Sequence, residues 1–449
     1  MSTETSAMTA EQIIADSTRY TLYDWHIQSK ASPLAIDRAE GVYMYGVDGR
    51  RWLDFSSQLM GVNIGHGDKR VTEAIARQAE KLPYVSPFHA FEGRAVLGKR
   101  LAGLWPGDLE KTFFTLAGAE ANENAVKMAK AVTGRQKVLA RYRSYHGSTY
   151  ATMALTGDPR RWPNEAPPMP GVVHVLDPYH GTKRGFEEAG TALELLEETI
   201  ELEGPETIAA FILEPVTGSS GAAVELPPGY LQAVRDVCDR YDVLLIADEI
   251  ITAFGRTGSW FAVEHDGALP DIVTFGKGIG GGVIPLSGMV ATRTVREVVG
   301  SSPSGFSYGH TFSGYPLGCA VGCAVIDTIV DEGLVDGAAA KGERIRAELE
   351  RMASAHPMMA ALRGRGLLQG IELRNPATGE RFAESERISG RVARAARERG
   401  LMIYSCPTPI LNRHMDAVML APPLIISDAE IDEMLEKLEA SIGAVESAL

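Results

Sequence analysis

Several residues that could do chemistry follow directly after short apolar runs, which are typical of buried strands. Lys277 comes one glycine after Ile272–Phe275, and Asp248 and Glu249 follow Val243–Ala247. In open α/β sheets, ligands bind at the carboxyl ends of the strands. We therefore expect these side chains to meet at one sheet edge, although they come from different parts of the chain.

Lys277 lies in a glycine-rich segment, residues 275–282. A lysine in apolar surroundings loses hydration, which lowers its pKa enough for Schiff-base chemistry. The glycines could let a bulky planar ligand approach the backbone. A phosphate loop is the alternative, but the pattern G-x-x-x-x-G-K-[ST] is not matched because Gly278 follows the lysine.

Three carboxylates stand at predicted strand ends. Asp248 and Glu249 precede a glycine-punctuated loop, and Glu214 follows Ile208–Leu213. Two carboxylates at one strand end could bind a metal ion, and one could equally pair with a protonated heterocycle. A solvated strand end is the plain alternative, and the residues alone leave all three open.

Two further segments could add to a ligand site. Residues 116–123 form a small-residue turn from a predicted strand into a predicted helix, where exposed N–H groups favour an anion. Tyr145 and His146 follow the predicted strand Lys137–Arg141 and could stack on an aromatic ligand. A plain strand-to-helix turn and a half-buried aromatic residue are the alternatives.

The elements that must position these residues show apolar runs alternating with amphipathic stretches, which predicts a mostly parallel sheet. The predicted strands are Thr112–Leu116, Lys137–Arg141, Val172–Leu176, Ile208–Leu213, Val243–Ala247, Ile272–Phe275 and Ser287–Thr292. The predicted helices are 119–133, 187–203 and 229–241, and further along lie a helical region at 316–355 and strands Leu367–Leu373 and Ala417–Leu420. We expect an α/β protein with a large domain at 66–315, a smaller α+β domain at 316–449, and an N-terminal segment, 1–65, that contributes to the small domain.

Composition narrows the class of function. The formal net charge of −14 argues against nucleic acid and an anionic membrane surface as partners. Four cysteines in 449 residues form no disulfide framework, and no second pair accompanies Cys319 and Cys323 for a structural metal site. The N-terminus resembles neither a secretory signal nor a transit peptide, and no apolar run approaches the roughly 20 residues of a membrane span. We therefore expect a cytoplasmic protein without a metal site.

Five segments together resemble the class III aminotransferases of pyridoxal-phosphate (PLP) fold type I. They are RYRSYHG, ADEIITAFGRTGSWFA, PDIVTFGKGIGGGVIPLSG, HTFSGYPLGCA and LAPPLII, and they follow one another in the order typical of that family. The resemblance extends from about Pro33 to the C-terminus. It implies a large PLP-binding domain, PLP as the cofactor, and a homodimer or tetramer with shared active sites.

The resemblance also implies roles for single residues. Lys277 would carry PLP and shuttle a proton, and Asp248 would pair with the pyridine nitrogen, because PLP accepts electrons only while that nitrogen is protonated. The other positions implied at the cofactor are Gly118 and Ala119 at the phosphate, Tyr145 on the ring, His146, Glu214, Ile250, and Thr311 reaching the phosphate across a dimer interface. Met60, Phe88 and Arg413 are implied at the substrate.

The sequence departs from the family at three positions. Ala117-Gly118-Ala119 replaces a common Ser-Gly-Ser, so phosphate binding would depend on backbone N–H groups and Thr311. Met60 replaces a tryptophan of many amine transaminases, which gives a softer pocket wall. Met419 stands where ornithine and γ-aminobutyrate relatives have an arginine. Arg413, in the loop-like stretch Pro409–Met415, resembles the mobile arginine of ω-amino-acid and amine:pyruvate transaminases, with one residue fewer in the loop.

These implications predict an ω-aminotransferase that uses a ping-pong mechanism through pyridoxamine phosphate. The expected donor is an amine or an ω-amino acid such as β-alanine or taurine, because RYRSYHG and TGDPRRW are similar to segments of enzymes that act on taurine and β-alanine-type donors. The expected acceptor is pyruvate. The alternatives are a 2-oxoglutarate-dependent aminotransferase and an aminomutase, racemase or decarboxylase of the same fold. A non-catalytic regulator would need an added basic DNA-binding domain, for which the first 40 residues leave no room.

Overall fold

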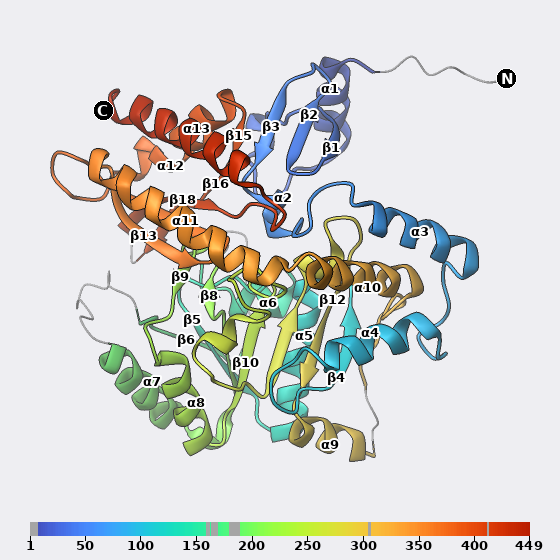
Figure 1. Ribbon diagram of the computed structural model, residues 1–449. Coiled ribbons are helices and arrows are strands. Elements are labelled where there is room, and N and C mark those ends of the chain that lie inside the picture. Colours follow the sequence, from blue (N-terminus) through green and yellow to red (C-terminus); the bar gives the residue numbers. More distant parts are fainter. Residues whose placement is uncertain (1–7, 159–161, 163–168, 179–188, 304–306, 411–412) are drawn as a thin grey trace.

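The computed structural model describes residues 8–158, 162, 169–178, 189–303, 307–410 and 413–449; for residues 189, 408–410, 413 and 414 it describes the backbone alone. Among these residues, the largest sheet has seven strands (Figure 1). Their order is β4 (Lys111–Thr115), β12 (Ser287–Ala291), β11 (Ile272–Phe275), β10 (Leu244–Glu249), β7 (Ile208–Leu213), β5 (Lys137–Arg141) and β6 (Val172–Val175).

Strand direction brings most carboxyl ends of this sheet to one edge. β10 is parallel to β11 and β7, and β5 is parallel to β7 and β6. β12 alone is antiparallel to its two neighbours, β11 and β4, so β4 again runs in the direction of β11. The predicted mostly parallel sheet is confirmed, and each of its seven predicted strands is present with ends within two residues. The predicted strand Ala417–Leu420 begins four residues earlier, at Arg413.

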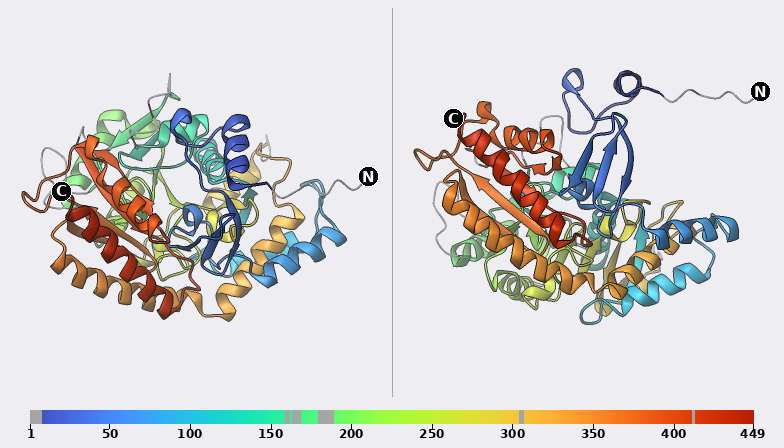
Figure 2. Two further views of the ribbon diagram at one scale, coloured as in Figure 1. Left: turned by 90° about the horizontal axis from the view of Figure 1, so that it is seen from above. Right: turned by 45° about the horizontal axis from the view of Figure 1, so that its top comes forward.

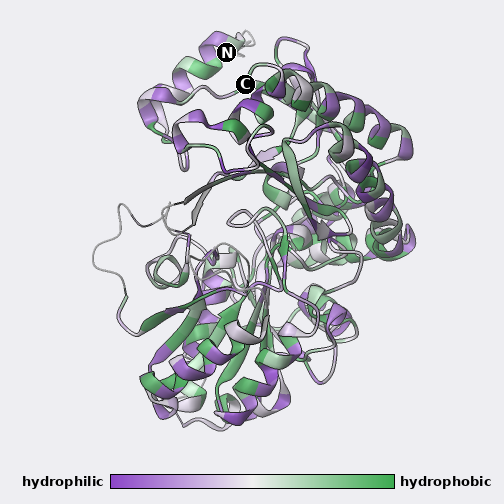
Figure 3. Cartoon of the chain, turned by 90° about the vertical axis from the view of Figure 1, so that its left-hand side faces the viewer, coloured by the Kyte–Doolittle hydropathy of each residue, from purple (hydrophilic) through white to green (hydrophobic). Residues whose placement is uncertain are grey.

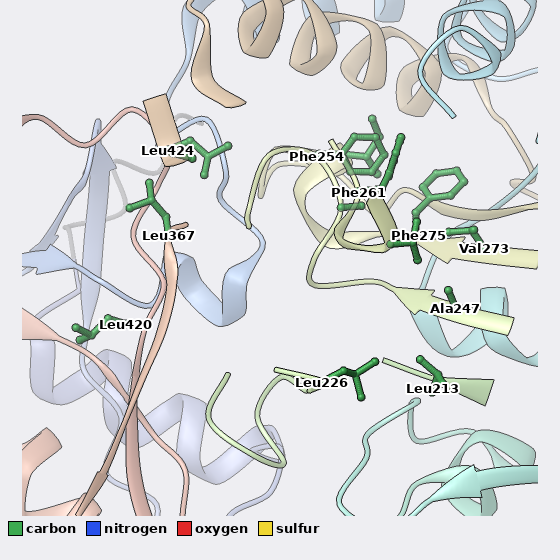
Figure 4. Packing of buried hydrophobic residues seen from close by; sticks show 14 of the residues in the cluster. Leu213, Leu226, Ala247, Phe254, Phe261, Val273, Phe275, Leu367, Leu420 and Leu424 are labelled. Atoms are coloured by element: carbon green, nitrogen blue, oxygen red, sulfur yellow. The ribbon is translucent and has the colours of Figure 1, made fainter. Parts of the chain in front are cut away.

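The two faces of the sheet divide the apolar side chains between two cores. Ile246 and Ile272 pack with residues of α5 (Gly118–Thr133) and α9 (Arg293–Ser301) on one face. Ala247 and Phe275 belong to the larger core on the other face, which includes residues of α7 (Ala189–Glu203) and α8 (Tyr230–Arg240). Figure 4 shows part of this larger core, and Figure 3 shows the strands mostly in the hydrophobic colour.

The two ends of the chain meet in one sheet. Its strands are β1 (Ile36–Glu40), β2 (Tyr43–Gly46), β3 (Arg51–Asp54) and, from near the C-terminus, β15 (Leu401–Met402), which pairs in parallel with β3. The first three strands stand beside the C-terminal helices (Figure 2). The domain limits at 65/66 and 315/316 stay a prediction.

The C-terminal part packs helices on a second sheet. Its strands are β13 (Met359–Arg365), β14 (Leu368–Leu373), β18 (Arg413–Leu420), β16 (Tyr404–Ser405) and β17 (Thr408–Ile410), and its helices are α12 (Ile388–Glu398) and α13 (Asp428–Glu446). The predicted helical region 316–355 is two helices, α10 (Pro316–Asp331) and α11 (Leu334–Ala355), because the chain turns at Gly333, whose φ is +59°.

One local prediction was wrong. Pro409–Met415 is not loop-like, because β17 pairs antiparallel with the start of β18, with Ile410 opposite Arg413. A hairpin satisfies the backbone N–H and C=O groups that a loop would leave to water. Residues 411 and 412 lie outside the described residues.

The remaining elements are shorter or peripheral: α1 (Ala10–Tyr20), α2 (Ser57–Met60), α3 (Lys69–Lys81), α4 (Glu92–Ala102), α6 (Tyr150–Leu155), β8 (Val216–Thr217) and β9 (Val224–Glu225). No helix in the described part of the chain is long and apolar enough to cross a membrane. The expected cytoplasmic location stays a prediction.

Candidate active site

The shared edge of the seven-stranded sheet places four predicted site residues after parallel strands. Lys277 follows β11, Asp248 is the second-last residue of β10, and Glu214 follows β7. Gly118 follows β4 and begins α5. The tertiary fold thus collects residues that are up to 159 positions apart, as the ends of parallel strands require.

Lys277 is a half-buried residue in a crowded position. It begins a short 3-10 turn, Lys277–Gly280, with a φ of +43°, which side chains rarely adopt. The glycines beside it are required by the protein itself, because a Cβ at Gly278 would lie 2.4 Å from Nδ2 of Asn63. Burial lowers the pKa of Lys277 to about 8, although the charges of Asp248 and Glu214 oppose the shift. A far larger fraction of this amine than of an ordinary lysine is therefore neutral near physiological pH.

Asp248 is a buried carboxylate with three N–H donors. Nδ1 of His146 lies 2.7 Å from Oδ2, and Nδ2 of Asn122 donates to the same oxygen at 2.8 Å. The backbone N–H of Ile250 donates to Oδ1 at 3.0 Å. Donors of this kind fix the orientation of the carboxylate.

Asn122 is a site residue that the sequence analysis missed. It lies on α5, where the sheet face that carries Asp248 and Thr274 meets the helix, and it is 1% exposed. Its side chain donates to Asp248 and accepts a hydrogen bond from Thr274 Oγ1 at 2.7 Å. One signal was present: Asn122 interrupts the apolar helix face that Ala125 and Ala129 continue, at the i, i+3, i+7 spacing.

Adjacent carboxylates do not form a metal site. Asp248 and Glu249 lie in β10, which extends two residues past the predicted end, so their side chains point to opposite faces of the sheet. Glu249 instead accepts hydrogen bonds from the Thr252 hydroxyl and from the backbone of Ala262 and Val263. No group of three or more His, Cys, Asp or Glu side chains able to hold a metal occurs among the described residues.

Glu214 organises the segment that carries Tyr145. Its two carboxylate oxygens accept hydrogen bonds from the backbone N–H of Tyr145, at 3.0 Å, and of Gly218, at 2.9 Å. Burial raises the pKa of Glu214. Tyr145 is half-buried, and the ring of Trp25, from the N-terminal segment, meets it edge-on with centroids 6.1 Å apart. The sequence analysis missed Trp25, because nothing local links it to Tyr145.

The first turn of α5 is suited to an anion. No side chain caps the start of this 16-residue helix. The Glu120 carboxylate accepts a hydrogen bond from the backbone N–H of Leu116 at 2.9 Å. A Cβ at Gly118 would lie 3.0 Å from the side chain of Ile250, which explains the glycine and brings Ile250 beside the turn. Uncapped N–H groups at a helix start bind phosphate.

Arg256 joins three parts of the chain just behind this cluster. Its buried guanidinium donates to Asn63 Oδ1 at 2.7 Å and to the carbonyl oxygens of Leu367 and Pro422. It thereby ties the N-terminal segment and the C-terminal part to the loop after β10. Burial lowers the pKa of Arg256 to about 9.

Thr311 and Phe88 are both exposed. The Tyr84 hydroxyl donates to the carbonyl oxygen of Thr311 at 3.0 Å, and the rings of Tyr84 and Phe312 are 5.2 Å apart. Phe88 is 94% exposed and lines a cavity of about 420 Å³ with Tyr308 and others. The structure of one chain therefore leaves their predicted roles untested.

The other predicted substrate residues are placed less directly. Met60 is 2% exposed and packs in an apolar cluster with Met415 and Met419. Arg413 is the first residue of β18, and its side chain lies outside the described part of the structure. Residues 159–161 of the TGDPRRW stretch also lie outside the described residues. Their substrate roles stay predictions.

The sequence profile of the family "Aminotransferase class-III" matches residues 26–442. The chain belongs to this family. It is an aminotransferase, and the resemblance stated from its motifs is confirmed.

Relatives and solved structures agree with this assignment. A putrescine–pyruvate aminotransferase of Pseudomonas aeruginosa is 33% identical over 89% of this chain and 88% of its own. The structure of an (S)-enantioselective omega-transaminase from Thermomicrobium roseum is 37% identical with a TM-score of 0.91, covering 98% of this chain and 100% of that one. The taurine:2-oxoglutarate aminotransferase of Bifidobacterium kashiwanohense, solved with PLP and glutamate, is 30% identical with a TM-score of 0.90, covering 99% and 100%. The predicted fold type I architecture is confirmed.

PLP is the cofactor of this family, and the cluster fits it. Lys277 supplies a buried amine, Asp248 a fixed carboxylate, and the start of α5 an uncapped anion site. Nε2 of His146 is buried without a hydrogen-bond partner among the described residues. The roles of the single residues at PLP follow below as proposals.

Proposed function

We propose that this aminotransferase moves an amino group from an amine or an ω-amino acid, such as β-alanine or taurine, to pyruvate in a ping-pong reaction. The observation that carries the proposal is the buried Lys277 amine, with a pKa of about 8, at the same sheet edge as the fixed Asp248 carboxylate. Each half-reaction needs a group that accepts a proton from the substrate carbon and returns it nearby. Lys277 has the pKa for both tasks.

Lys277 would carry PLP covalently and act as the proton shuttle. The bound cofactor supplies an electron sink while its ring nitrogen is protonated. Asp248 would face that nitrogen, because opposite charges favour the charged form. Gly118 and Ala119 would hold the phosphate through their N–H groups, next to Ile250.

Tyr145 would stack on the cofactor ring, and Glu214 and His146 would position the groups around it. Glu214 fixes the backbone of Tyr145, and His146 fixes Asp248, so both would act through a neighbour as well as by contact. Removing water from this buried pocket would strengthen the ion pair between Asp248 and the ring nitrogen.

A homodimer, or a tetramer built from it, would complete the site. The exposed rings of Tyr84, Phe88 and Phe312 are apolar surface that a second copy would cover. Thr311 would then reach the phosphate of the PLP bound to the partner. This contact would matter more here because Ala117 and Ala119 have no hydroxyl groups to offer the phosphate.

Arg413 would bind the carboxylate of the keto acid. It is the first residue of β18 and pairs with Ile410 of β17. A guanidinium recognises a carboxylate with two parallel hydrogen bonds. Met60 and Phe88 would form apolar walls of the substrate pocket, Phe88 from the partner copy.

The acceptor is the point on which the relatives differ, since one is named for pyruvate and another for 2-oxoglutarate. The experiment is a panel of amine donors run against both keto acids. Turnover that requires pyruvate supports the proposal. Turnover with 2-oxoglutarate alone assigns the second acceptor, and turnover without any keto acid indicates an aminomutase or a related reaction.

A further inference from the structure

We propose that Asn122 is a positioning residue of the transamination reaction, which sets the orientation and the charge of Asp248. This inference rests on the proposed role of Asp248 at the cofactor ring. Asn122 would act through Asp248 and need not touch the cofactor.

The contacts of Asn122 link three elements at the sheet edge. Its Nδ2 atom donates to Asp248 Oδ2 and to the carbonyl oxygen of His146, both at 2.8 Å. Its Oδ1 atom accepts from Thr274 Oγ1 at 2.7 Å. Asp248 and Thr274 are opposite one another in the pairing of β10 with β11, so α5 is pinned to both strands at the point where the carboxylate emerges.

The orientation of this amide is unambiguous. Asp248 carboxylate oxygen and the His146 carbonyl oxygen can only accept hydrogen bonds, so the Asn122 nitrogen must face them. The Thr274 hydroxyl has a proton to give and faces the Asn122 oxygen. All hydrogen-bonding capacity of the amide nitrogen is used, and the side chain is 1% exposed, so no water competes.

This arrangement decides which oxygen of Asp248 serves the cofactor. Oδ2 already accepts from Asn122 and His146, whereas Oδ1 accepts only from the Ile250 N–H among the described residues. A carboxylate oxygen has two lone pairs, so Oδ1 keeps one acceptor direction for the N–H of a pyridinium ring. Without the Asn122 donor, Oδ2 would be under-satisfied, and the carboxylate could rotate about its last bond.

The test uses two variants that act on the same contact. Asn122→Leu removes the donor with little change in volume, and Thr274→Val removes only the hydroxyl that orients the amide. Among the described residues, the Thr274 hydroxyl donates to Asn122 and forms no hydrogen bond with Asp248, so its loss changes the hydrogen bonds of Asp248 only through Asn122. Thr328→Val is the matched control, because Thr328 is also fully buried and its hydroxyl bonds only to Ala324 O, in α10.

The first readout is the dissociation constant of PLP, measured by equilibrium dialysis of the apoprotein. We expect Asn122→Leu to weaken binding about 10-fold or more, the effect of losing a hydrogen bond to a charged group. Thr274→Val should weaken it about 2–10-fold, and Thr328→Val should leave it unchanged. With the amine substrate varied, the kcat of Asn122→Leu should fall while its KM stays close to the wild-type value.

The second readout reports the charge that Asp248 is proposed to hold. In holoenzyme loaded with PLP labelled at the ring nitrogen, nitrogen NMR follows protonation of that atom with pH. We expect it to lose its proton at a lower pH in Asn122→Leu and, less markedly, in Thr274→Val. A residue that only stabilises the fold would lower the melting temperature without moving this titration.

The outcomes separate the inference from the proposed function. If the folded variants match the wild type in PLP affinity and in ring-nitrogen titration, the role of Asn122 is overturned. If Asn122→Leu does not fold, Thr274→Val decides the question by the same two measurements. If the wild-type ring nitrogen is not protonated in the holoenzyme, the role of Asp248 itself is wrong, whatever the variants do.

Discussion

Nδ1 of His146 lies 2.7 Å from Oδ2 of Asp248, and both side chains are buried. The two residues are 102 positions apart and come from neighbouring parts of one sheet edge. With Nδ1 as the donor, the imidazole needs no positive charge to hold the carboxylate, and its Nε2 is free of partners among the described residues. This pair makes the negative charge at position 248 part of a fixed arrangement, and the first prediction follows from it.

Asp248→Asn should leave the fold intact and lower kcat by about 100-fold or more, the usual loss when one fixed electrostatic partner of a reacting group is removed. The amide can still accept from His146, but it has no charge to keep the ring nitrogen protonated. Steady-state kinetics and a melting curve of the holoenzyme would check this. Near-wild-type kcat with PLP bound would exclude the pairing role.

Lys277→Ala should abolish covalent attachment of PLP. The purified wild-type protein should be yellow, and borohydride should fix the cofactor to the peptide that contains Lys277. Mass spectrometry of the digested protein reads this directly, with Lys341 as an internal control because it is a second partly buried lysine with a lowered pKa. Label on Lys341 instead of Lys277 would contradict the assignment.

Covalent capture of PLP by the apoprotein should quicken as pH rises, with a midpoint near 8, because burial lowers the pKa of Lys277 to about 8 and the neutral amine reacts. Unfolded, this lysine keeps its proton to its ordinary pKa of 10.5, so the unfolded state binds more protons between about 8 and 10.5. The contribution of Lys277 to the free energy of unfolding of the apoprotein therefore rises with pH across that window.

Stopped-flow absorbance across pH would measure this capture. In Asp248→Asn the midpoint should move lower, because the Asp248 charge raises the pKa of Lys277. A midpoint that stays near the ordinary lysine value in the wild type would show that the amine is hydrated in solution.

Phe88→Asp should shift the protein toward monomer and weaken PLP binding. A charge placed at Phe88, on the surface that a second copy would cover, would be buried without a partner in a dimer. In the wild type, adding PLP to apoprotein should raise the dimer fraction in sedimentation, because a ligand shared between copies favours their association. Leu202→Asp is the control, since Leu202 is 81% exposed on α7. Monomers of equal mass with and without PLP would count against the shared site.

Arg413→Ala should weaken the half-reaction with pyruvate by about 2–5 kcal/mol, the scale of a lost charged pair. The half-reaction with an amine that has an uncharged tail should change far less, because no carboxylate is then bound. Single-turnover spectra of both half-reactions would decide, with Arg394→Ala, an exposed residue of α12, as the control. Equal effects on both half-reactions, or none, would rule out the role.

Local pattern was enough to predict the frame of the site. Lys277, Asp248 and Glu214 each follow or end an apolar run, and a run of that length and composition can be recognised as a buried strand without knowing its neighbours. The motifs around Lys277 and Asp248 were enough for the family as well. The hairpin at Pro409–Met415 was missed because its pairing is set by the partner strand β18, which a proline-containing stretch does not reveal.

The tertiary structure decided which atoms meet. Asp248 and Glu249 look like a pair in the sequence, but a strand that continues through both sends them to opposite faces, one to Asn122 and His146 and the other to Thr252. Strand register against β11 then sets Thr274 beside Asn122. The contacts of Asn122 and His146 with Asp248 and of Asn122 with Thr274 join residues more than 100 positions apart, and they depend on which strand lies next to which. The amino-acid pattern of each segment determines whether it forms a helix or a strand and which of its faces is buried. The hydrogen-bond partners of its polar atoms are determined only when the segments pack together.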